Sequence, residues 1–67
     1  MTKDDALRIV EVIRRLAAEH EHPRAHATEE GLRERFIRFV AERPDELGEM
    51  ARVVLSTGKI RFGRWYE

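Results

Sequence analysis

The residues with the clearest capacity for chemistry are three histidines that fall within seven consecutive positions of this 67-residue chain. They are His20, His22 and His26. Imidazole nitrogen is a good ligand for zinc and nickel, and three such ligands would leave one coordination position open. Against this, side chains two residues apart at a helix end point about 200° apart. Zinc or nickel binding is therefore the last of three functional hypotheses, and its competitor is a polar connection without a cofactor.

Nucleophilic catalysis has little support in this sequence. Ser56 is the only serine and Tyr66 the only tyrosine, and neither stands at a recognisable spacing from a histidine and a carboxylate. The segment 56–59 contains a Gly-Lys step, but a phosphate-binding loop needs glycine where Val53 stands and Ser or Thr where Ile60 stands. A chain of this length also has little material left to enclose a substrate pocket. We therefore expect a protein that is not an enzyme and has no cofactor.

The C-terminal segment 59–66 has the composition of a contact surface. Ile60 and Phe62 alternate with Arg61 and Gly63, which is the two-residue period of a β-strand. A lone strand leaves backbone polar groups unpaired, and no second strand is evident elsewhere in the chain. We therefore expect a strand paired between subunits, or an extended tail packed on the helices. The candidate partner-binding residues are Ile60, Arg61, Phe62, Arg64, Trp65 and Tyr66.

The same segment supports a second hypothesis, binding of nucleic acid. Basic and aromatic side chains interleave between positions 59 and 66, a mixture suited to phosphate contact and base stacking. The formal net charge of the chain is zero, which argues against a positive field over the whole surface. Nucleic acid is therefore an alternative partner, ranked below protein.

Helical periodicity accounts for the rest of the chain. Thr2 and Asp5 form a capping-box pattern that predicts a helix over about 3–20. Pro23 disfavours helical geometry at the residue before it, which predicts a loop over 21–28. Thr28 then caps a predicted helix over about 29–42. The apolar positions of this second helix are Leu32, Phe36, Phe39 and Val40.

A third helix is predicted over about 45–57. Pro44 ends the second helix and opens the third, and Gly58 is expected to form a left-handed C-terminal cap. The residues expected to face inward from this helix are Leu47, Met50, Ala51 and Val54. The predicted fold is a mainly α, compact single domain of three helices with a short C-terminal strand or extended tail.

The amino-acid composition predicts the cellular compartment of this domain and the kind of organism it comes from. The absence of cysteine excludes disulfides and thiolate metal sites and favours a reducing cytoplasm, and no apolar run is long enough to span a membrane. Arginine predominates over lysine, and asparagine and glutamine are absent, which is typical of a heat-adapted bacterial protein. Without disulfides, a core of this size contributes only about 3–5 kcal/mol. We therefore expect a non-catalytic interaction module or regulatory subunit that binds a second copy of itself or another protein.

Overall fold

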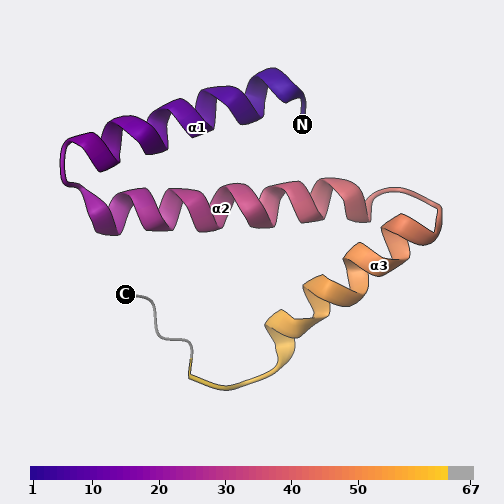
Figure 1. Cartoon of the computed structure of the whole chain (residues 1–67). Coiled ribbons are helices and arrows are strands. Elements are labelled where there is room, and N and C mark those ends of the chain that lie inside the picture. Colours follow the sequence, from indigo (N-terminus) through magenta and orange to yellow (C-terminus); the bar gives the residue numbers. More distant parts are fainter. Residues whose placement is uncertain (64–67) are drawn as a thin grey trace.

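The structure, a computed structural model, describes residues 1–63 and contains three α-helices (Figure 1). They are α1 (Lys3–Ala18), α2 (His22–Ala41) and α3 (Glu46–Leu55), and a short 3₁₀ helix, η1 (Ser56–Lys59), follows. The prediction of a helical domain with three helices is confirmed. The predicted strand is absent from residues 59–63, and positions 64–66 of that prediction lie outside the described residues.

The three helices lie in a single layer. α1 and α2 run antiparallel side by side, and α3 folds back along the other side of α2 (Figure 1). The chain measures 40 × 33 × 9 Å along its principal axes, and its radius of gyration is 14.0 Å. A compact domain of this length has a radius of gyration of about 11 Å. The prediction of a compact domain is therefore wrong, because no element within residues 1–63 covers either face of the layer.

Helix α1 begins and ends in defined capping motifs. The Asp5 backbone N–H donates to Thr2 Oγ1 at 3.1 Å and the Thr2 N–H donates to Asp5 Oδ2 at 3.0 Å, which confirms the predicted capping box. At the other end, the Glu21 N–H donates to the carbonyl of Leu16 at 2.8 Å, and His20 adopts a positive φ of 60°. This is a Schellman motif with histidine in the left-handed position.

The sequence placed a left-handed cap at Gly58 instead, and this prediction is wrong. Gly58 has no positive φ and lies within η1. The 3₁₀ helix continues the last turn of α3 without a reversal, so no left-handed residue is required there. Histidine is among the residues that tolerate the left-handed region, which explains how His20 can serve the Schellman motif in place of glycine.

Helix α2 starts at His22, so the predicted loop over 21–28 is wrong. Pro23 stands in the first turn of the helix, where its missing N–H would have had no helical partner. The Ala25 N–H donates to the carbonyl of Glu21 at 2.9 Å, which begins the helical ladder. Thr28, the predicted cap, lies inside α2 and donates its hydroxyl to the Arg24 carbonyl at 2.8 Å.

A hydrogen-bond network sets the corner between α2 and α3. Asp45 caps α3 by accepting from the Gly48 N–H at 3.2 Å, and it pairs with Arg43 across 3.1 Å from Nε. Arg52 reaches back from α3 and donates Nη1 to the carbonyls of Ala41 at 2.6 Å and Arg43 at 3.2 Å. Carbonyls at the end of α2 that lack helical partners are thereby satisfied. The network fixes how α3 leaves α2.

Two glycines make a matched test of this corner. A Cβ on Gly48 would run into the backbone carbonyl of Arg43, whereas a Cβ on Gly31, inside α2, would meet nothing. We expect Gly31→Ala to stabilise the protein by about 1 kcal/mol through helix propensity. We expect Gly48→Ala to destabilise it by at least about 2 kcal/mol, because the corner must open. Thermal and denaturant unfolding measure both, and equal effects of the two substitutions would contradict the proposed close approach.

The acid dependence of stability tests the two helix caps. The Arg43 guanidinium, and next the Gly48 N–H, hold the pKa of Asp45 below its usual value. The backbone N–H of Thr2 and next its side chain lower the pKa of Asp5. A carboxyl with a lowered folded-state pKa stabilises the fold above its unfolded pKa, near pH 4, and this stabilisation is lost as pH falls through the folded pKa.

We therefore expect wild-type melting temperature to fall between about pH 4 and pH 2. Asp45→Asn keeps a capping oxygen but removes the charge, so it should melt lower than wild type at pH 7 and show a flatter acid limb. Arg43→Met removes the main cause of the pKa shift and should flatten the same limb. Melting curves recorded across this range would contradict the proposed effect of the Asp45–Arg43 pair if all three proteins lose stability in parallel.

Candidate functional site

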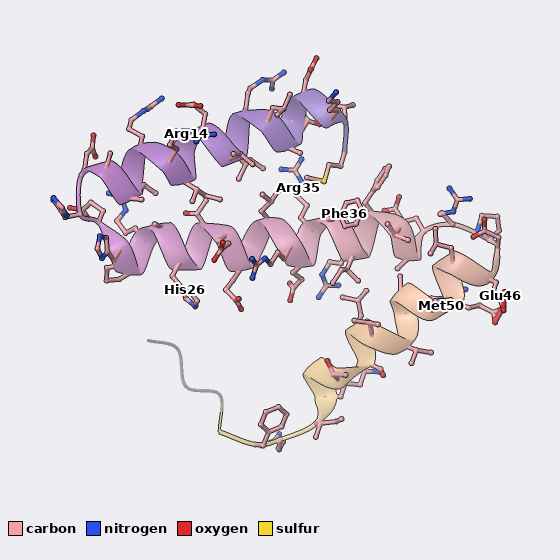
Figure 2. All side chains as sticks on the ribbon, in the orientation of Figure 1. Arg14, His26, Arg35, Phe36, Glu46 and Met50 are labelled. Atoms are coloured by element: carbon pink, nitrogen blue, oxygen red, sulfur yellow. The ribbon has the colours of Figure 1, made fainter. Side chains whose placement is uncertain are left out.

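The predicted metal ligands are not brought together as a set. The rings of His20 and His22 lie 5.8 Å apart between centroids, tilted by 48°. His26 belongs to α2 and points away from α1 (Figure 2). Within residues 1–63, no three side chains of His, Cys, Asp or Glu lie together so as to hold a metal ion. The connection that was expected to present all three histidines is shorter than predicted, because α2 takes up His22 and His26.

The predicted partner-binding segment is only partly described. Ile60 has extended backbone angles, and its N–H donates to the Thr57 carbonyl at 3.0 Å, which continues the turn of η1. Ile60, Arg61 and Phe62 are all exposed. Arg64, Trp65 and Tyr66 lie outside the described residues. In the described part, the segment is an extended continuation of η1 and forms no strand.

The layer leaves most large apolar side chains in contact with water. Among the described residues, the buried apolar side chains are those of Leu16, Ala25 and Ala51. The large apolar residues that stay exposed are Leu7, Val10, Val12, Phe36, Phe39, Leu47, Met50, Val53, Val54, Ile60 and Phe62. The inward face predicted for the third helix is therefore mostly wrong: Ala51 is buried against α2, whereas Leu47, Met50 and Val54 are half exposed.

Several of these residues form one continuous surface across the three helices. A depression between α1 and α2 is lined by Met1, Ala6, Leu32, Arg33, Phe36 and Ile37. A second depression, between α2 and α3, is lined by Phe36, Ile37, Val40, Leu47, Met50, Ala51 and Val54. The two share Phe36 and Ile37, so they join (Figure 2 labels Phe36 and Met50). We call the surface formed by Ala6, Leu32, Ile37 and the α2–α3 lining residues the apolar face.

The other side of the layer is charged. Residues two apart in a helix lie about 200° around its axis, so Arg38 and Glu42 lie opposite Phe36 and Val40. A depression on that side is lined by Glu34, Arg35, Arg38 and Glu42, together with Met1, Gly31 and Phe39. Arg38 also pairs with Glu34 at 3.3 Å. The apolar stripe predicted for the second helix is thus divided, because Phe39 belongs to the charged side.

The apolar face has the chemistry of a contact surface. The α2–α3 depression is lined only by side chains of carbon, hydrogen and sulfur. The nearby hydroxyls are engaged: Ser56 Oγ donates to the Val53 carbonyl at 2.6 Å and Thr57 Oγ1 to the Val54 carbonyl at 2.9 Å. Such a surface can exclude water against a complementary apolar surface, and its only heteroatom is the thioether sulfur of Met50, which is a weak hydrogen-bond acceptor.

Comparison with known proteins assigns no family or function to this chain. No family model, curated protein or solved structure matches this chain. Within residues 1–63, no helix has both the length and the apolar character needed to cross a membrane.

Sequence reasoning missed the apolar face because periodicity shows which residues share a side of a helix, but not what covers that side. Phe36, Met50 and Val54 have the spacing of core residues, and the sequence assigned them to a core. The signal that could have pointed to an uncovered apolar face is the small size of the chain, which provides few elements to form a second layer.

Proposed function

We propose that this protein is a small, non-catalytic interaction module that works by burying its apolar face against a protein partner. The observation that supports this proposal is a layer 9 Å thick with a continuous apolar surface on one side and charge on the other. Contiguous apolar surface on a protein of this kind marks an interaction site. We place this action in the cytoplasm, the location expected from the absence of cysteine.

The accessible surface of the chain supports an association role. A compact monomer of 7.9 kDa exposes about 4,400 Å². This chain exposes 5808 Å², about 1,400 Å² more. A stable protein–protein interface of ordinary size buries about 800 Å² on each partner. The excess, to which the exposed C-terminal residues Ile60 and Phe62 contribute together with the apolar face, is larger than the area that one partner supplies to such an interface.

A photo-crosslinking amino acid tests the proposal in cells that express the full chain. Benzoylphenylalanine replaces Phe36 on the apolar face, and in a matched control it replaces Arg38 on the charged side of the same helix. We expect irradiation to yield protein adducts from position 36 and few from position 38, although the Arg38 side chain is 65% exposed. This asymmetry is expected because only the apolar face is covered by a partner.

The adducts also discriminate between hypotheses. Equal yields from the two positions, or no protein adduct from position 36, would refute the proposed role of the apolar face. Adducts that nuclease removes and protease does not would favour the nucleic-acid hypothesis instead. The mass of each protein adduct reports whether the partner is another copy of this chain or a different protein.

A further inference from the structure

We infer that the partner covering the apolar face is a second copy of this chain, packed face to face about a two-fold axis, with Phe36 of each copy seated in the α2–α3 depression of the other. This inference rests on the proposed function and adds the identity and register of the partner. It differs from the strand pairing expected from the sequence, because the contact lies on the helices and not on the C-terminal segment.

The surface area available for contact is consistent with a second copy of this chain. Obligate homodimers bury roughly 1,000–2,500 Å² on each chain, and their interfaces resemble a domain core cut in half. The surplus of about 1,400 Å², which the apolar face shares with the exposed residues Ile60 and Phe62, is of the same order. Stacking two layers would also produce the two-layer architecture in which helical domains normally bury their apolar stripes. A chain without disulfides and with few buried side chains gains most from such a partner.

The apolar face carries an exposed ring and a hollow side by side. Phe36 is 55% exposed and stands where the two depressions meet, directly beside the hollow lined by Leu47, Met50 and Val54. In a two-fold contact, a residue that touches a second residue on the partner must be touched by that same residue in return. An exposed ring next to a hollow on one surface would satisfy this requirement through one pair of symmetry-related contacts. A different protein would have to supply both features independently.

Charge is compatible with self-association. The chain carries 13 basic and 13 acidic residues, so two copies have no net repulsion. No charged side chain lines the α2–α3 depression, so stacking two copies there desolvates no ion. Arg33, at the edge of the α1–α2 depression, pairs with Glu29 at 3.3 Å. The charged sides, with Arg38 and Glu42, would face outward into water on both surfaces of the dimer.

Sedimentation of the wild-type chain tests the dimer first. We expect a mass of twice 7.9 kDa at micromolar concentrations. A monomer throughout, up to high micromolar concentration, would overturn the inference. It would not by itself overturn the proposed function, because adducts of position 36 with other proteins would still support that function.

Complementation between two variants tests the register. Phe36→Lys and Met50→Glu each place a charge at both reciprocal contacts of a homodimer, and we expect each to raise the dimer Kd by at least about 100-fold. In a mixture, one contact brings the introduced lysine against the introduced glutamate, and the other retains the native Phe36–Met50 contact. We therefore expect the mixture to form a heterodimer whose Kd lies within about 10-fold of the wild-type value.

Arg38→Gln on the charged side is the control, and its dimer Kd should stay within about 3-fold of wild type. Recovery on mixing is specific to a reciprocal contact between these two positions, and it does not depend on either variant dimerising alone. A mixture that remains monomeric or unfolded would overturn the proposed seat of Phe36. A control variant that weakens dimerisation as much as Phe36→Lys would place the interface on the other side and overturn the inference.

Discussion

The constraint on which the rest of the structure depends is that, in the part of the chain that the structure describes, α2 packs against α1 and α3 on two opposite sides and against no element on its remaining faces (Figure 1). The α1–α2 connection is short, because α2 starts as soon as the Schellman motif ends α1. At the other end, Gly48 lets α3 approach the Arg43 backbone, and Arg52 ties α3 to the carbonyls that end α2. Both connections keep their helices beside α2, in its plane. A third helix placed over α1 and α2 would have closed a core, and this geometry does not allow it.

The uncovered face follows from that arrangement. On each helix the apolar side chains span a wider angle around the axis than the strip that packs against the neighbouring helix. On α3, the small residues Gly48 and Ala51 are buried, with Gly48 against the Arg43 backbone at the corner, while Leu47, Met50 and Val54 stay exposed beside them. On α2, Phe36 and Val40 lie between the directions of α1 and α3. A helix packed through small residues approaches its neighbour closely and leaves its larger side chains at the edge. The layer therefore presents its largest apolar groups to whatever lies above it.

Local signals in the sequence predicted the local structure, and tertiary packing decided the rest. The Thr2–Asp5 capping box was readable because its partners are three residues apart. Pro23 was misread because a proline ends one helix or begins the next according to the residues around it, and the short Schellman connection leaves room only for a beginning. The face containing Phe36 and Met50 was not readable as exposed, because burial depends on where α3 lies relative to α2. The C-terminal candidates Arg64, Trp65 and Tyr66 lie outside the described residues.

The relative size of the available interactions indicates that apolar burial, and not surface polarity, has to stabilise this fold. The described residues include six ion pairs, each with at least one exposed partner, and surface pairs contribute about 0–1 kcal/mol each. Helix caps add about 1 kcal/mol each. Ordering the backbone costs about 1–2 kcal/mol per residue, so these contributions cannot hold more than 60 residues in place. Apolar burial is the contribution that reaches the size of this entropy cost, and a second surface over the apolar face would add to it.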